Sequence, residues 1–516
     1  MCYRERKIRQ YNRYHRVLAN QDNRKNMATA IRDIKKPSLL DALIPVVSLI
    51  SMLACTVYVF GLDSFGPNQV ALIFAAAIAA MIGIKNGHSW KDIEKGMIET
   101  ISMSLQALLI LLMVGSLIGS WILSGTVPTM IYYGVALMSP DYFYLTACTV
   151  CALLGFSIGS SWTVAGTLGI GLMGIAAALD LSLGISAGAI ISGAYFGDKL
   201  SPLSETTNLA AAVTGNDLFD HIQHMLWTTV PAMVITLILF FFIGLGSNSN
   251  VVITDIVTLQ NAMDEAFTIN PLMLGPMILL LVMAVKKLPA LSTLICGTLA
   301  GCLFAALFQW DAVISLAGDA NLPTVAAAFK GLFSAMFLGY SSASGNESLD
   351  ALLSKGGMSS MLTTVGLVVN AMAFGGAMTR TGLLARLVEA ALSRVKSAGG
   401  LITATIGTCI GTNLLAADQY LSIVIPGQMF VQPYKERRLK SINLSRTLED
   451  SGTLTSALVP WNTCGAYMSA TLGVSTFYYA PYAFFNILCP IIAVVYAFSL
   501  IAVPTIEDDS LKSTGG

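Results

Sequence analysis

The stretch Gly197-Asp-Lys-Leu-Ser-Pro-Leu-Ser-Glu-Thr-Thr-Asn208 interrupts a long apolar segment, with the apolar runs 185–196 and 209–213 on either side. It holds two carboxylates, a lysine, several hydroxyls and an amide. Pro202 removes a backbone N–H group and Gly197 makes a break easier, so we expect the helix to unwind at this point. The segment therefore predicts a broken helix that brings polar groups into an apolar environment.

The composition of the whole chain identifies that environment as a lipid bilayer. Of the 516 residues, 55% are hydrophobic and only 11% are Asp, Glu, Lys or Arg, whereas soluble proteins carry about 25% charged residues. Apolar runs recur along the chain without the regular alternation of barrel strands, so the spans are helices. The sequence therefore predicts an all-α polytopic membrane protein. It excludes a soluble enzyme, a nucleic-acid-binding protein, a disordered chain and a secreted disulfide scaffold.

We expect about ten transmembrane helices and two re-entrant hairpins. The hairpins are 142–180 and 400–431, because small polar residues interrupt each apolar stretch midway, at 157–163 and at 407–413. If each of these two stretches instead crossed the membrane twice, every later loop would still lie on the same side of the membrane. The predicted spans are 38–60, 68–84, 97–123, 185–213, 226–246, 271–287, 289–309, 358–379, 452–475 and 480–503. Segments predicted to lie along the interface are 125–139 and 380–396, and 323–341 is predicted to be external and amphipathic.

Basic residues set the predicted orientation. Residues 1–36 hold 11 of the 29 Lys and Arg residues, without the apolar core of a cleaved signal peptide. A basic segment before a first span stays on the cytoplasmic side, so both termini are predicted to be cytoplasmic in a cell membrane. The predicted organisation is a basic cytoplasmic segment (1–36), a first membrane repeat (37–246), an external linker (247–270), a second membrane repeat (271–503) and a cytoplasmic tail (504–516).

The two halves are predicted to be inverted repeats. Five crossings and one hairpin per half make an odd number of crossings, so two such halves in series have opposite orientations, an arrangement common among secondary transporters. A shift of 252 residues aligns the polar interruptions of the two halves. The aligned pairs are Gly155 with Gly407, Ser160 with Thr412, Asp198 with Asp450, Ser201 with Thr453 and Ser204 with Ser456.

The polar residues of the first half form the predicted cation site. Carboxylate, hydroxyl and unwound carbonyl oxygens suit a hard cation such as Na⁺, and the half-helix ends contribute their dipoles. Glu205 aligns with Ala457, so the main site is predicted on the side of Glu205. The residues predicted to bind Na⁺ or a proton are Asp198, Ser201, Ser204, Glu205, Thr206, Asn208, Ser160, Ser161 and Thr163, with Na⁺ held chiefly at Asp198 and Glu205.

The second half supplies a predicted pseudo-symmetric site or substrate pocket. Its residues are Asp450, Thr453, Ser456, Asn462, Trp461, Thr412, Asn413 and Asp418. The alternative for all of these polar residues is that they only hold helices together through hydrogen bonds. In that case Asp198 could simply pair with the adjacent Lys199.

The motifs resemble the NhaC-type sodium/proton antiporter family. The run 197–209 carries the most specific part of the resemblance, which extends over about 38–503. The other matching segments are Trp90-Lys-Asp-Ile-Glu-Lys-Gly96, Ser124-Gly-Thr-Val-Pro128, Leu352-Leu-Ser-Lys-Gly-Gly357 and Glu449-Asp-Ser-Gly-Thr453 with Pro460-Trp-Asn462. The resemblance implies inverted repeats with re-entrant hairpins and Na⁺/H⁺ antiport, although some relatives couple Na⁺ or H⁺ to organic anions or amino acids, including malate/lactate exchange. The family motif often has Asp at the position of Glu205.

The predicted function is Na⁺/H⁺ antiport by alternating access. Protonation of a carboxylate removes the charge that holds Na⁺, so the two ions compete for one group. No nucleotide-binding loop is present, so ion gradients rather than ATP supply the work. The expected partners are Na⁺, H⁺ and membrane lipid, with no cofactor and no nucleic acid, and a homodimer would supply the fixed scaffold of an elevator-type motion. The alternative is a Na⁺- or H⁺-coupled carrier of a small organic anion or amino acid; no motif supports an enzyme.

Overall fold

The computed structural model describes most of the chain as helix. The described residues are 34–60, 65–246, 253–319, 321–342, 344, 346–393, 395 and 397–506. Most of the predicted basic segment, the start of the predicted linker and the end of the predicted tail lie outside them. Among the described residues, nine helices are long and apolar enough to cross a membrane, or up to eleven if each of two bent pairs is one span. The predicted all-α polytopic architecture is confirmed.

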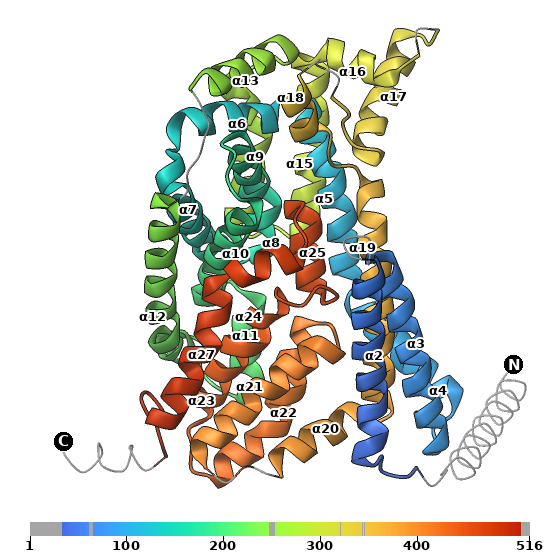
Figure 1. Cartoon of the computed structure of the whole chain (residues 1–516), viewed down its shortest axis with the longest axis vertical. Coiled ribbons are helices and arrows are strands. Elements are labelled where there is room, and N and C mark those ends of the chain that lie inside the picture. Colours follow the sequence, from blue (N-terminus) through green and yellow to red (C-terminus); the bar gives the residue numbers. More distant parts are fainter. Residues whose placement is uncertain are drawn as a thin grey trace, which may run out of the picture.

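The first half of the chain runs from α2 to α12 (Figure 1). Its helices are α2 (Leu39–Phe60), α3 (Phe65–Lys85), α4 (Trp90–Met103), α5 (Leu105–Leu123), α6 (Thr126–Leu137), α7 (Phe143–Ile158), α8 (Ser161–Val164), α9 (Ile170–Ala178), α10 (Leu183–Leu200), α11 (Glu205–Thr214) and α12 (Leu218–Leu245). The predicted span 97–123 is divided at Ser104. The reason is that α4 carries five charged residues and is too polar to continue the apolar helix α5.

The second half runs from α13 to α27. Its helices are α13 (Ile253–Ala266), α14 (Gly275–Val285), α15 (Ala290–Phe308), α16 (Trp310–Ala317), α17 (Thr324–Phe337), α18 (Glu347–Leu353), α19 (Met358–Arg380), α20 (Leu383–Leu392), α21 (Ala398–Leu415), α22 (Gln419–Glu436), α23 (Ser441–Leu448), α24 (Leu454–Ser456), α25 (Thr463–Leu472), α26 (Thr476–Tyr479) and α27 (Phe484–Ser499). A π-helical turn, Glu449–Thr453, joins α23 to α24. The predicted span 452–475 is therefore part of a longer, broken element that begins at Ser441.

Each half contains a pair of helices that reverses direction. After α9, the Ser182 N–H group donates to the Tyr144 hydroxyl at the start of α7 (3.2 Å). After α22, Arg437 donates to the carbonyls of Val395 (2.6 Å) and Ser397 (2.7 Å), just before α21. Figure 1 shows the first pair in the upper part of the molecule and the second pair in the lower part. The two ends of each pair therefore meet, at opposite ends of the protein; that the pairs are re-entrant in a bilayer stays a prediction.

The turn of the second pair does not lie at the predicted position, 407–413. Those residues continue α21, because the hydroxyls of Thr408 and Thr412 bond back to the carbonyls four residues earlier, at 2.7 and 2.9 Å. The break lies instead where Ala417 takes a positive φ of 57° and Asp418 caps α22. The first pair turns within its predicted interruption, at Gly159, whose φ is +72°.

The helix ends favour a register between the halves of 258 residues rather than the predicted 252. The matching positions are the N-caps Ser160 and Asp418, the N-caps Ser204 and Asn462, and the glycines Gly215 and Gly473, which end α11 and α25 at a φ of 70°. In this register Asp198 corresponds to Ser456 rather than to Asp450. The structure therefore does not support Asp198 and Asp450 as symmetric counterparts.

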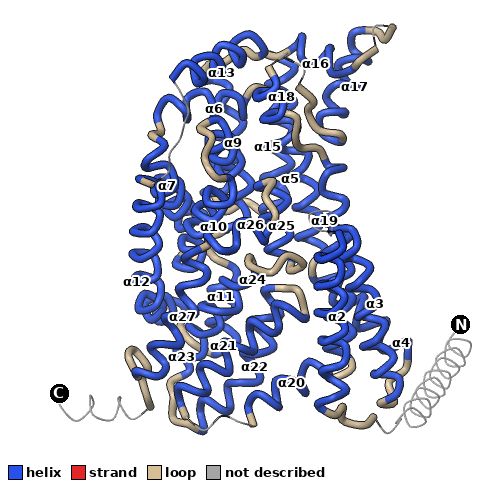
Figure 2. Tube along the Cα trace, in the orientation of Figure 1, coloured by secondary structure: helices blue, strands red, loops and turns tan. Residues whose placement is uncertain are grey.

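The two halves pack through matching contacts. α3 of the first half packs on α19 of the second half, and α17 of the second half packs on α5 of the first. Near the centre, α11 packs on α22 and α25 packs on α8. Figure 2 shows loop segments among the helices at this level, near α24 and α25. The helix breaks and hairpin turns therefore meet in the middle of the molecule.

Candidate ion-binding site

The first carboxylate of the site is Asp198, two residues before the end of α10. Its side chain is 7% exposed and accepts hydrogen bonds from the Ser161 N–H group (3.1 Å) and the Ser161 hydroxyl (2.7 Å). Ser161 is the first residue of α8, directly after the turn of the first hairpin. Ser161 supplies both donors, one from its backbone and one from its side chain, and each stabilises a negative charge on Asp198. The structure thus brings together Asp198 and Ser161, as the sequence predicts.

The second carboxylate is Glu205, the first residue of α11 after the break at 201–204. Glu205 is exposed, and its Oε2 atom accepts a hydrogen bond from the Tyr420 hydroxyl at 2.6 Å. Tyr420 is the second residue of α22, at the turn of the second hairpin. The two carboxylates on either side of one helix break therefore contact the turns of two different hairpins.

The sequence analysis did not identify Tyr420. A signal for it exists in the register of 258 residues, where Tyr420 corresponds to Trp162. Trp162 also contacts the other half: its ring stacks on Tyr467 of α25, with ring centroids 4.1 Å apart. An aromatic residue two positions after each hairpin cap is thus the shared feature.

The remaining predicted residues of the first half shape the break. Ser160 accepts the Thr163 N–H group (3.2 Å), Ser201 accepts the Leu203 N–H group (3.3 Å), and Ser204 lies 3.1 Å from the Thr206 hydroxyl. The Asn208 amide donates to the carbonyls of Pro202 (2.9 Å) and Ser204 (2.7 Å). The predicted polar residues of this segment thus hold the unwound backbone in place beside the two carboxylates. The predicted break at Pro202 is present.

The predicted residues of the second half mostly bond to one another. The Asn413 amide donates to the Gly452 carbonyl (2.7 Å), and the Asn462 amide donates to Asn413 Oδ1 (3.0 Å). The Trp461 indole donates to the Leu414 carbonyl (2.8 Å). These side chains tie the second hairpin to the second broken helix. The predicted pocket residues therefore have a clear structural role.

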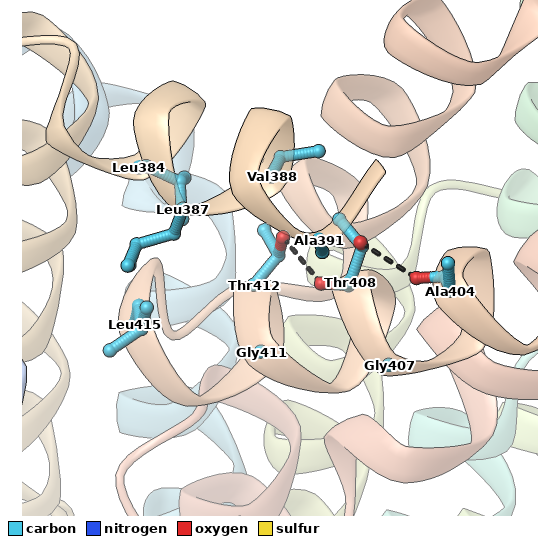
Figure 3. A pocket seen from close by; sticks show the side chains of 10 residues that line it. All are labelled: Leu384, Leu387, Val388, Ala391, Ala404, Gly407, Thr408, Gly411, Thr412 and Leu415. Atoms are coloured by element: carbon cyan, nitrogen blue, oxygen red, sulfur yellow. Dashed lines mark hydrogen bonds between the residues drawn. The ribbon is translucent and has the colours of Figure 1, made fainter. Parts of the chain in front are cut away.

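Asp418 joins that network through the Thr463 hydroxyl, which lies 3.4 Å from both Asp418 Oδ2 and Asn462 Oδ1, whereas the Thr412 hydroxyl bonds within α21. Asp418 is 5% exposed and caps α22 by accepting the N–H groups of Tyr420 (2.9 Å) and Leu421 (3.1 Å). Thr412 lines a mainly apolar cavity of about 370 Å³ between α20 and α21, with Thr408 beside it (Figure 3). The remaining predicted residues, Thr453 and Ser456, are buried on the π-helical turn and on α24.

A buried ion pair joins the two halves next to the site. Lys199 is fully buried and donates to Asp450 Oδ1 at 2.7 Å. The same oxygen accepts the Thr228 hydroxyl (2.9 Å) and the Cys489 thiol (3.2 Å). Lys199 therefore pairs with Asp450 of the other half and not with the adjacent Asp198, so Asp450 serves as its counter-ion.

One histidine, His221, belongs to this interior. Asp217 accepts the N–H groups of Phe219 (2.8 Å) and Asp220 (3.2 Å), so α12 begins at Leu218. His221 therefore lies in the first turn of α12 and is fully buried. The aspartate directly before an apolar run was the available signal for this helix start.

Two helix pairs that reverse direction, together with a broken helix whose carboxylates meet their turns, define a secondary transporter. The sequence model described as the Na⁺/H⁺ antiporter family matches residues 193–500. The chain is 36% identical over 468 residues to the Na(+)/H(+) antiporter NhaC of Alkalihalophilus pseudofirmus, covering 91% of this chain and 96% of that protein. The chain therefore belongs to the NhaC-type Na⁺/H⁺ antiporter family. It is a transporter, not an enzyme.

Two further relatives have other printed activities. The chain is 34% identical over 471 residues to the malate-2H(+)/Na(+)-lactate antiporter of Bacillus subtilis, covering 91% of this chain and 96% of the relative. It is 35% identical over 472 residues to the arginine/ornithine antiporter ArcD of Halobacterium salinarum, covering 90% and 93%. Relatives with a similar degree of identity to this chain are thus named for different transported substrates.

Proposed function

We propose that this protein exchanges Na⁺ for protons by alternating access. The observation that carries the proposal is the position of Asp198 and Glu205. They flank one helix break, and each accepts a hydrogen bond from the turn of a different hairpin. Tyr420 belongs to the second half, so a cation bound at this break would lie at a contact between the two halves.

The exchange would rest on competition at these carboxylates. Na⁺ would bind to the carboxylate oxygens with the Ser161 hydroxyl beside Asp198, because a hard cation prefers oxygen ligands. A proton on either carboxyl group removes the negative charge that attracts Na⁺. Each ion thus displaces the other, which is the chemical requirement for exchange.

Contacts across the halves offer a way to couple binding to movement. The Tyr420 hydroxyl reaches from the second hairpin to Glu205 of the first half. The Trp162 carbonyl accepts the Tyr467 hydroxyl (2.8 Å) in the opposite direction. In alternating access, one set of such contacts breaks while the other holds, so that the site faces each side in turn.

The orientation that we propose has both termini in the cytoplasm of a cell, with residues 37–246 and 271–503 as inverted membrane repeats. Lys35 donates its N–H group to the Asn86 carbonyl (2.9 Å), and Lys440 donates to the Pro504 carbonyl (3.1 Å). Both ends of the described chain thus lie beside loops that are flanked by basic residues. Basic loops favour the cytoplasmic side. A homodimer would supply a fixed scaffold for the moving parts.

The direct test uses proteoliposomes that contain a pH-sensitive dye and hold an imposed pH difference. Na⁺ is added without any organic solute. Prompt dissipation of the pH difference, which K⁺ at the same ionic strength does not cause, is the expected result. No response to Na⁺ contradicts the proposal.

The second candidate function is coupled exchange of a small organic anion or amino acid. The relatives named for malate/lactate and arginine/ornithine exchange favour it, because they are about as similar to this chain as NhaC is. The same vesicles distinguish the two functions. Proton movement that appears only after malate, lactate or arginine is added would identify the organic solute as an obligatory substrate.

A further inference from the structure

Glu449 is a buried carboxylate that the exchange mechanism above does not use. It lies on the π-helical turn between α23 and α24 and is fully buried. Neither of its carboxylate oxygens has a hydrogen-bond partner, and the hydroxyl of Thr453, one turn later, also lacks one. Buried polar atoms in folded proteins are almost always hydrogen-bonded or bound to a ligand. Three such oxygens on one buried turn can act as ligands of a bound group.

The surrounding charges show which kind of group could bind there. The other two carboxylates of this core have donors: Asp198 has Ser161, and Asp450 has Lys199. Two cations, Lys199 and Arg446, face three carboxylates, so the core holds one more acidic group than basic groups. Glu449 is the acidic group without a donor. The ligand that would complete this site is therefore cationic.

Arg446 does not fill this role. Its guanidinium donates to the Ala502 carbonyl (2.8 Å), and its Nε atom lies 3.9 Å from Asp450 Oδ2. The Nε and Nη2 atoms of Arg446 have no hydrogen-bond partner, so none of them bonds to Glu449. The charge of Glu449 is therefore not neutralised by a direct contact with this arginine.

We propose that Glu449 and Thr453 form a second cation site, which binds a monovalent cation, either Na⁺ or a proton. Lys199 reaches the neighbouring residue, Asp450, to which it donates at 2.7 Å, and α11, which carries the buried Thr206, packs on the π-helical turn. The site thus lies where α11 of the first half packs on the π-helical turn of the second half. This inference rests on the proposed exchange function and extends it with a site at a second contact between the halves.

Other titratable groups of this core bear on the pH at which the site changes its ligand. They are Asp198 and Lys199 on α10, His221 and His224 on α12, Arg446 on α23, Asp450 on the π-helical turn and Cys489 on α27. Both ring nitrogens of His221 lack a hydrogen-bond partner. Because several of these groups can exchange protons, the test measures bound Na⁺ and released protons separately.

The experiment compares Glu449→Gln with the wild type as purified full-length protein. Bound ²²Na⁺ is measured by equilibrium dialysis at alkaline pH, and proton release on addition of NaCl is followed with a dye in weakly buffered solution. If the ligand is Na⁺, the variant binds one Na⁺ fewer per chain. If the ligand is a proton, the variant binds as much Na⁺ but releases one proton fewer. A variant that equals the wild type in both measurements overturns the inference.

Matched variants separate the site from general effects. Glu436→Gln makes the same change at an exposed glutamate, which accepts the Gln432 amide at 3.1 Å, and is expected to behave as the wild type. Thr453→Val removes one of the unpartnered oxygens and no charge, so it keeps the test valid if Glu449→Gln does not fold. It is expected to change the Na⁺ concentration for half-maximal binding or proton release at least about tenfold, since an interaction of a hydroxyl with a charged group is worth about 1.5–3 kcal/mol. An unchanged concentration overturns the inference.

Failure of this inference is distinguishable from failure of the proposed function. Wild-type protein that exchanges Na⁺ for protons in proteoliposomes, together with a Glu449→Gln variant that matches it in both binding measurements, contradicts only the second site. Wild-type protein that neither binds Na⁺ nor exchanges it contradicts the proposed function itself.

Discussion

At the residue scale, the proposed role of Glu205 is to hold Na⁺ with its negative charge. A neutral isostere at this position should abolish that role. The Glu205→Gln variant keeps an acceptor for the Tyr420 hydroxyl but loses the charge that would hold Na⁺. We expect Na⁺-dependent proton movement to fall at least tenfold, which corresponds to about 1.4 kcal/mol, while the protein still inserts and purifies as a single species. Glu389→Gln changes an exposed glutamate on α20 and is the control. Exchange at the wild-type rate in Glu205→Gln would refute the role of this carboxylate.

Tyr420 offers a test of the contact across the halves that leaves every charge in place. Tyr420→Phe removes only the hydroxyl that donates to Glu205 at 2.6 Å. Hydrogen bonds to charged groups contribute about 1.5–3 kcal/mol, so we expect the apparent Na⁺ affinity to change about tenfold or more. The Na⁺ dependence of the exchange rate measures it. Tyr478→Phe, at a tyrosine that is 63% exposed, should have no effect; the same absence of effect in Tyr420→Phe would show that the contact is not functional.

Only some of the residues that form the site could be predicted from the sequence. The cluster 197–208 is recognisable because charges are rare in apolar segments, and this cluster contains both Asp198 and Glu205. The partners of those carboxylates come from other elements. That Asp450, about 250 positions away, pairs with Lys199 depends on how the fold places α10 beside the π-helical turn, which no local pattern encodes.

At the scale of elements, the ion pair between Lys199 and Asp450 links α10 to the second broken helix. Lys199→Met would leave Asp450 buried without the cation that donates to it, with only Arg446 Nε 3.9 Å away, and breaking a buried pair in this way costs about 3–5 kcal/mol. We expect a lower thermal unfolding temperature, measured by loss of the monodisperse peak on size-exclusion chromatography after heating.

The double variant Lys199→Met/Asp450→Asn tests whether the effect comes from the unpaired charge. It is expected to recover most of the lost stability, because no uncompensated carboxylate remains and the amide can still accept from Thr228. Lys330→Met is the control at an exposed pair, 3.9 Å from Asp319, where the expected loss is below about 1 kcal/mol. A double variant as unstable as Lys199→Met would contradict this explanation.

The ends of helices were predictable where a single residue, such as a proline or a glycine, favours a break in the helix. Pro202 marks the break after α10, and Gly159 marks the turn of the first hairpin. The turn of the second hairpin was placed too early because glycines and threonines at 407–413 suggested a break. In the structure the threonine hydroxyls are satisfied by their own helix, and the turn depends on a positive φ at Ala417, a conformation that alanine does not signal.

At the scale of the whole molecule, the two halves contribute one carboxylate break and two hairpin turns to a common centre. The polytopic helical class followed directly from the composition, because lipid leaves few alternatives to helices. The register of the halves did not, because glycine and serine recur too often to fix an alignment. Helix caps, which require a specific backbone conformation, favour a register of 258 residues.

The central claim is that Na⁺ and protons compete for the same carboxylates, Asp198 and Glu205. The most direct measurement is the Na⁺ dependence of exchange in proteoliposomes across a series of pH values. The account predicts that, on the acidic side, the Na⁺ concentration for half-maximal exchange rises about tenfold per pH unit for each competing proton, with an unchanged maximal rate. A half-maximal Na⁺ concentration that does not vary with pH would contradict competition at a shared site.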